Sequence, residues 1–160
     1  MLDFLESWID DVNYSHLAVR RPCSTFQRQF RGFYSPELLD ASYYAIVDAL
    51  PLPDLPELRE AGLGDFIANH NQFDGITYKD TYYLLPKAAD DVSIHFHELV
   101  HVIQWRELGP RAFIQRYIEE IQTFGYSRQA PLEGMAFGLQ DHFDEGAKPF
   151  DVEKEVFESL

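Results

Sequence analysis

One segment of this 160-residue chain, Ser93 to Leu108, constrains the fold most strongly, because it combines helix signals with a histidine pair. Its first serine or the preceding Asp90-Asp91 can cap a helix, and Gly109-Pro110 can end it. His97 and His101 are four residues apart, so on a helix they lie one turn apart and about 40° apart in projection. The fold must therefore accommodate a helix that carries two imidazoles on one face.

The residue that follows the first histidine, Glu98, points about 100° away from His97 on such a helix. It is poorly placed as a ligand, but it can reach a water bound to an ion between the histidines. Zinc lowers the pKa of bound water to about 7, and a nearby carboxylate can then accept its proton. Random placement at this composition gives His-Glu-x-x-His only about 0.02 times per chain. The pattern predicts one Zn²⁺ with Glu98 as general base.

A catalytic zinc ion needs a third protein ligand and one open position. Glu107 lies six residues beyond the second histidine, about 240° around the helix, and therefore points away from the ion. Glu133 begins another predicted helix, and an intervening helix can return the chain to the histidines. Asp141 and His142 lie on that same predicted helix, more than two turns further on. These last three residues remain as candidates.

From about Gly75 to Gln140 the sequence resembles the gluzincin metallopeptidases. In that family the two-histidine helix is followed, at variable distance, by a helix with Glu-x-x-Ala or Glu-x-x-Asp, and this chain reads Glu-Gly-Met-Ala from residue 133. The resemblance implies that His97, His101 and Glu133 hold the zinc ion and that Glu98 is the general base.

The resemblance also implies a role for Tyr126, which precedes Glu133 by seven residues. In some gluzincin-like domains a tyrosine in this relation faces the metal, where its hydroxyl can donate a hydrogen bond to an oxyanion. The alternative is that Tyr126 is simply one of the nine tyrosines and belongs to the core.

Upstream of the histidine helix, Gly75 to Leu85 is rich in β-branched and aromatic residues, with a plausible turn at Lys79-Asp80. This pattern predicts a β-hairpin. It resembles the small sheet of the zincin fold, whose edge strand binds an extended peptide by β-augmentation. The sequence does not indicate which strand would be the edge.

The rest of the chain has a helical pattern at both ends. We expect helices over 111–124, from about 131, and in the tail, and a helical piece over 35–50; the prolines of 51–58 predict an extended or turned segment. The expected fold class is α+β and zincin-like: a small antiparallel or mixed sheet packed on the active-site helix, followed by a helical C-terminal part. We expect one domain over 1–160, with a mostly helical part over 1–55 and the metal-site core over 75–142.

Composition excludes several classes of function. The net charge of −14 repels a phosphate backbone, and the basic residues near Arg20-Arg21 are too few to offset it, so no nucleic-acid partner is expected. No apolar stretch approaches the roughly 20 residues of a membrane span. The acidic start shows no signal peptide, and one cysteine, Cys23, permits no internal disulfide. We expect a soluble, cytoplasmic protein in which Cys23 and His95 are buried structural residues.

These observations favour a zinc-dependent hydrolase that cleaves peptide bonds, an endopeptidase rather than an exopeptidase, with a peptide or protein as substrate. Two alternatives remain. The chain could be an accessory module of zincin fold whose zinc site is occluded, or the histidine spacing could be coincidental. The sequence leaves the oligomeric state open.

Overall fold

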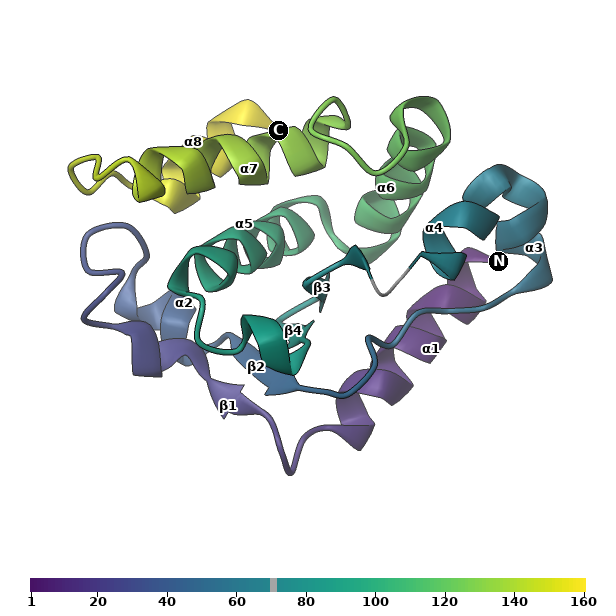
Figure 1. Ribbon diagram of the computed structural model, residues 1–160, viewed down its shortest axis with the longest axis horizontal. Coiled ribbons are helices and arrows are strands. Elements are labelled where there is room, and N and C mark those ends of the chain that lie inside the picture. The colour runs from purple at the N-terminus through teal and green to yellow at the C-terminus, as the bar shows by residue number, and fades with distance from the viewer. Residues whose placement is uncertain (70–71) are drawn as a thin grey trace.

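The computed structural model describes residues 1–69 and 72–160, and α5 (Val92–Leu108) runs through the middle of the molecule (Figure 1). A small sheet lies on one side of α5, and α7 (Pro131–Asp144) and α8 (Val152–Ser159) lie on the other. The chain is therefore α+β. The predicted helix containing the histidine pair is confirmed, with the Asp91 side chain accepting a hydrogen bond from the Ser93 amide at its start.

The remaining elements fall into an N-terminal group, a hairpin and one more long helix. The N-terminal group is α1 (Leu2–Ser15), β1 (Arg21–Pro22), η1 (Cys23–Phe26), α2 (Pro36–Asp40), β2 (Tyr43–Ile46), α3 (Pro56–Leu58), η2 (Arg59–Leu63) and α4 (Gly64–Ala68). The hairpin strands β3 (Gly75–Tyr78) and β4 (Thr81–Leu84) lead through η4 (Pro86–Ala88) into α5, and α6 (Pro110–Phe124) connects α5 to α7. The predicted helices near 111–124, 131 and the tail are thus confirmed.

The sheet is mixed, with the strand order β1-β2-β4-β3. β3 and β4 are antiparallel and joined at Lys79-Asp80, as predicted, and Lys79 takes the left-handed conformation (φ 60°) that the tight turn requires. β2 lies parallel to β4, and β1 pairs antiparallel with β2. β3 is consequently an edge strand of the sheet, and it contacts α5.

The prediction of a helical piece over 35–50 is wrong beyond its first turn. Ser35 caps α2 as expected, but α2 ends at Asp40 and Tyr43–Ile46 forms a strand. Tyr43, Tyr44 and Ile46 are residue types that favour strands, and parallel pairing with β4 stabilises the strand. The N-terminal part therefore mixes short helices and strands, and the proline-rich segment becomes helical again at Pro56.

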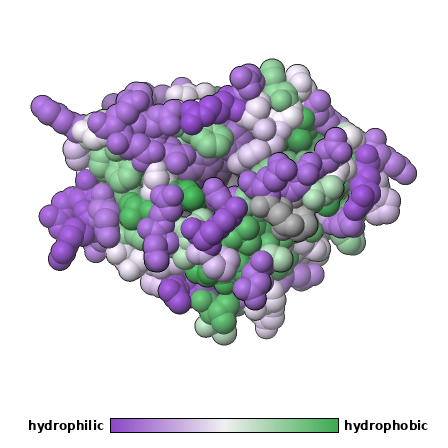
Figure 2. All heavy atoms as spheres, viewed as in Figure 1, coloured by the Kyte–Doolittle hydropathy of each residue, from purple (hydrophilic) through white to green (hydrophobic). Residues whose placement is uncertain are grey.

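Two apolar clusters occupy the two faces of the sheet. In β4, Tyr82 and Leu84 belong to the cluster that includes α8, whereas Tyr83 belongs to the cluster that includes α1, as the alternation of side chains along a strand requires. Figure 2 shows a mostly hydrophilic face, with apolar residues gathered at the lower edge near the loop after α1, where Leu17 and Val19 are exposed. Among the described residues, no helix combines the length and apolar character that a membrane crossing needs.

Candidate metal centre

The histidine pair and Glu133 meet between α5 and the start of α7. His97 Nε2 and His101 Nε2 are 3.1 Å apart, and they lie 3.2 Å from Glu133 Oε2 and Oε1 respectively. Ligand atoms about 2.0–2.1 Å from a tetrahedral ion are about 3.3 Å from one another. The three residues are 3–5% exposed. Their spacing fits a zinc-sized ion, and we call them the triad.

Two glutamines orient the imidazoles. Gln104 Oε1 is 2.7 Å from His101 Nδ1, and Gln140 Oε1 is 3.0 Å from His97 Nδ1. An amide oxygen only accepts hydrogen bonds, so each Nδ1 carries a proton and each Nε2 is directed into the triad. The amide nitrogen of Gln104 donates to the Leu132 carbonyl at 3.0 Å, which fixes which end of the amide faces His101.

The carboxylate of Glu133 has two unlike oxygens. Oε1 accepts a hydrogen bond from the Tyr117 hydroxyl at 2.8 Å, whereas Oε2 is the buried side-chain atom without a hydrogen-bond partner among the described residues. Burial alone would lower the pKa of His101, but the Glu133 carboxylate raises it to about 9, and the imidazoles in turn lower the pKa of Glu133 against its burial. A buried carboxylate that shares a proton with the facing imidazoles is a site where a metal cation can take the place of that proton.

Glu98 lies beside the triad without joining it, as the helix geometry predicts. Its Oε2 accepts a hydrogen bond from the Thr77 hydroxyl of β3 at 2.6 Å. Burial raises the pKa of Glu98, and the neighbouring His97 and His101 oppose that rise. Gly75 on the same strand leaves the room that Glu98 needs, because a Cβ there would be 2.9 Å from Glu98 Oε1.

Two tyrosines approach the carboxylates. Tyr126 lies between α6 and α7, 40% exposed, with its ring against Phe66 and Phe73. Burial raises its pKa, and the charges of Glu133 and Glu98 add to that rise. Tyr126 lines the same cavity as these two carboxylates. Tyr117 has the direct contact with Glu133, which the sequence did not predict, because Tyr117 fits the apolar stripe of α6.

The structure places the other candidate ligands away from the triad. Glu107 forms an ion pair with Arg106 at 2.9 Å, so its rejection is confirmed, and Asp141 pairs with Arg128 at 2.6 Å. His142 is exposed and its ring lies against Phe150. None of these residues belongs to the group that could hold an ion.

His95 and Cys23 are buried structural residues, as expected. The Tyr82 hydroxyl is 2.6 Å from His95 Nδ1, and the Ala89 carbonyl is 2.8 Å from His95 Nε2, so both ring nitrogens have partners. Cys23 donates to the Tyr82 hydroxyl at 3.5 Å, and burial raises the pKa of its thiol to about 12. Neither side chain is available to the triad.

Comparison with known protein families, with curated proteins and with solved structures found no match for this chain.

Proposed function

We propose that this chain is a zinc-dependent peptidase with a zincin-like core, in which His97, His101 and Glu133 hold one zinc ion and Glu98 is the general base. The observation that carries the proposal is the separation of roles among buried carboxylates. Glu133 directs one oxygen at the Nε2 atom of each histidine, and one of these oxygens has no hydrogen-bond partner among the described residues, whereas Glu98 is held by Thr77 next to them. Two nitrogens, one carboxylate and an adjacent base are the donor set of a catalytic zinc site.

The side chains then act in sequence. Zinc bound at the triad would polarise the carbonyl of the scissile bond and lower the pKa of a bound water. Glu98 accepts the proton of the attacking water and delivers it to the leaving amine. Thr77 holds Glu98 in place, and Tyr117 holds the ligand Glu133. Tyr126 lines the same cavity as Glu98 and Glu133, and in this proposal its hydroxyl stabilises the developing oxyanion.

The test compares the parent with Glu98→Gln, which keeps the size of the side chain but removes the base. Both proteins should bind one zinc ion per chain by elemental analysis. Only the parent should cleave a diverse peptide mixture, read by mass spectrometry. Glu107→Gln is the matched control, because it makes the same change on the exposed side of α5 and should leave cleavage intact. Equal cleavage by Glu98→Gln and the parent would exclude this mechanism.

The burial of the triad favours a second candidate, an accessory module with an occluded zinc site. His97, His101 and Glu133 are each at most 5% exposed. On this hypothesis the parent and Glu98→Gln both bind zinc stoichiometrically, and neither cleaves any peptide.

A further inference from the structure

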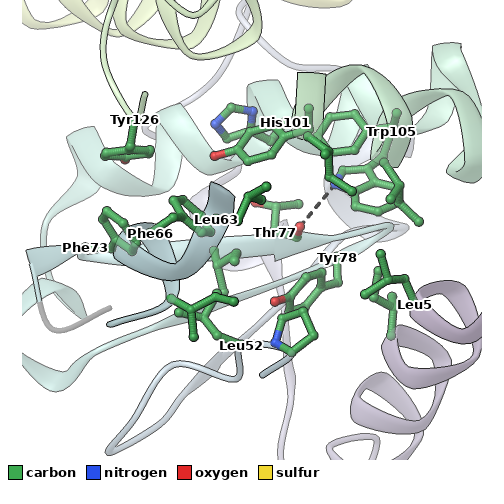
Figure 3. Close-up of a pocket in the computed structure, with 18 of the residues that line it drawn as sticks. Leu5, Leu52, Leu63, Phe66, Phe73, Thr77, Tyr78, His101, Trp105 and Tyr126 are labelled. Atoms are coloured by element: carbon green, nitrogen blue, oxygen red, sulfur yellow. Dashed lines mark hydrogen bonds between the residues drawn. The ribbon is translucent and has the colours of Figure 1, made fainter. Parts of the chain in front are cut away.

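A cavity of about 110 Å³ lies directly beside the triad. Its walls come from parts of the chain that are distant in sequence: α1, the segment 52–67 with Phe73, strand β3, α5 and α6, together with Tyr126 and Glu133. Figure 3 shows His101 and Tyr126 at one side of this cavity and Leu5 and Leu52 at the opposite side. The cavity therefore extends away from the triad toward the N-terminal part.

The lining of the cavity changes in character along its length. Glu98, His101 and Glu133, with the two tyrosines, bring polar groups to the side of the triad. The other walls are almost entirely apolar; they include Leu5, Ile9, Leu58, Leu63, Ile114 and Ile118. A ligand that fits this gradient has a polar reacting group and, a few bonds away, an apolar group.

The size of the cavity limits that apolar group. An apolar protein cavity of about 150 Å³ holds one benzene molecule. A cavity of about 110 Å³ is therefore suited to a branched aliphatic group of about four or five carbons. An indole or a long alkyl chain would be too large.

The outer edge of β3 is not free to pair with a long peptide. The Asp74 carbonyl accepts from the Leu85 amide in the ladder with β4, so the backbone groups of Gly75 and Thr77 point away from β4. The Thr77 carbonyl already accepts a hydrogen bond from the Trp105 indole at 3.1 Å. β-Augmentation along this edge is thus restricted to the surroundings of Gly75.

The wall that faces β3 is fastened to it by hydrogen bonds. The Asn13 side chain of α1 donates to the Tyr78 carbonyl at 3.0 Å, and the Tyr78 hydroxyl donates to the Pro51 carbonyl at 2.6 Å. The N-terminal part therefore closes the far end of the cavity. An extended chain that entered beside the triad would meet this wall after few residues.

We propose that the cavity receives one branched aliphatic side chain from a short peptide whose scissile bond lies at the triad. This inference rests on the proposed peptidase function and narrows the expected substrate from a peptide or protein to a short peptide. The cavity selects the side chain by volume, and the closed wall selects against chain length.

The first experiment measures ligand binding and needs no turnover. Acetohydroxamate, 4-methylpentanohydroxamate and octanohydroxamate are titrated into the zinc-loaded parent by calorimetry. Affinity should rise about fourfold for each added carbon that enters the cavity. It should reach its maximum with the branched compound and gain nothing further with the octanoyl chain. Equal affinities for all three hydroxamates would overturn the inference, and so would an affinity that still rises with the octanoyl chain. Either result would leave the proposed zinc site in place.

Ile118→Trp fills the cavity from α6 without changing any residue of the triad. With this substitution, hydroxamate affinity should no longer rise with the size of the aliphatic group, and the affinity for acetohydroxamate should be unchanged. Gln115→Trp adds the same bulk at an exposed position of α6 and should behave like the parent. If Ile118→Trp keeps the gain, the cavity is not the binding site.

The second experiment compares a leucine-containing tetrapeptide with a 20-residue peptide that contains the same four residues internally. The parent should cleave the tetrapeptide and leave the long peptide intact, and Glu98→Gln should cleave neither. Equal cleavage of both peptides by the parent would overturn the length limit. If the hydroxamates bind in the predicted order but cleavage is equal with and without Glu98, the proposed mechanism fails and the cavity assignment stands. If the protein binds neither zinc nor hydroxamate, both fail.

Discussion

Two regions along α5 contain histidines of equal burial and opposite character. On the side of the sheet, His95 is fully buried, and both its ring nitrogens have partners, the Tyr82 hydroxyl and the Ala89 carbonyl. On the side of α7, His97 and His101 each have one partnered nitrogen, while the other faces its neighbour and Glu133. Burial of a histidine therefore does not distinguish a structural residue from a candidate ligand; a second imidazole and a buried carboxylate beside the same ring nitrogen do.

The largest effect is expected when a histidine of each region is replaced by leucine and zinc binding is compared. His101→Leu removes one lone pair from the triad, and zinc affinity should fall by more than the 10–100-fold that changes outside the ligand set cause. His95→Leu should retain one zinc ion per chain. Equilibrium dialysis against a zinc buffer measures both affinities. Loss of zinc from His95→Leu alone would reverse the assignment of the two regions.

The two variants should also differ in stability. His95→Leu leaves the Tyr82 hydroxyl without an acceptor and the Ala89 carbonyl without its donor, which should lower the free energy of unfolding by about 2–4 kcal/mol. Zinc at a hundred times its Kd should raise the free energy of unfolding of the parent by about 2.7 kcal/mol, and chelation should remove that gain. Urea denaturation with and without zinc separates the two effects. His101→Leu should show no zinc-dependent shift.

A further test concerns Gln104, which contacts the ring nitrogen of His101 that points away from the triad. Gln104→Leu removes the acceptor of His101 Nδ1 and the donor to Leu132, and zinc affinity should fall 10–100-fold. Gln104→Glu keeps the acceptor and should recover most of that loss. Gln129→Leu, at an exposed position, is the matched control and should bind zinc like the parent. An unchanged affinity in Gln104→Leu would contradict the role of this contact.

A smaller effect is expected at the base. Thr77→Val deletes the hydrogen bond to Glu98, and the rate of peptide cleavage should fall on the order of tenfold with zinc content unchanged. Thr81→Val changes a buried threonine of the neighbouring strand that has no contact with Glu98, so cleavage per folded molecule should stay the same. Cleavage kinetics on a single peptide, together with metal analysis, decides the point. Equal rates for Thr77→Val and the parent would show that Glu98 does not need this contact.

The smallest effect is expected for the thiol of Cys23, which lies near His95 in the region where both ring nitrogens have partners. Cys23 is hydrogen-bonded to Tyr82, and its burial raises the pKa of the thiol to about 12. A raised pKa keeps the thiol protonated at pH 8, so a thiolate-specific reagent should not react until the protein unfolds. Labelling followed by absorbance, with and without urea, checks this. Rapid labelling of the folded protein would mean that the region around His95 opens.

Local signals made much of this structure predictable. The caps of α5, the turn at Lys79-Asp80 and the positions of α6 and α7 depend on neighbours in sequence, and all appear where the pattern places them. The strand Tyr43–Ile46 was missed because its hydrogen bonds go to β4, almost forty residues away. Its aromatic residues fit a short helix equally well when read alone.

The same distinction holds within the candidate site. The spacing of His97, Glu98 and His101 predicts their mutual geometry, because they share one helix. The contacts of Gln104 and Tyr117 depend on how α5, α6 and α7 pack, and no local pattern encodes that packing. The cavity depends on an even more distant relation, since α1 forms one of its walls.

The absence of a side chain at Gly75 has a consequence for classifying other chains of this shape. A methyl group at this position would lie 2.5 Å from Leu84, 2.9 Å from Glu98 and 3.0 Å from the Tyr83 carbonyl, whereas no atom of His97, His101 or Glu133 is among these nearest neighbours. On the proposed mechanism, a chain with alanine at this position would keep the His-Glu-x-x-His pattern and the proposed ligands, yet its Glu98 would be displaced and it would not cleave peptides. Residue 75, rather than the motif itself, would then separate active chains from inactive ones.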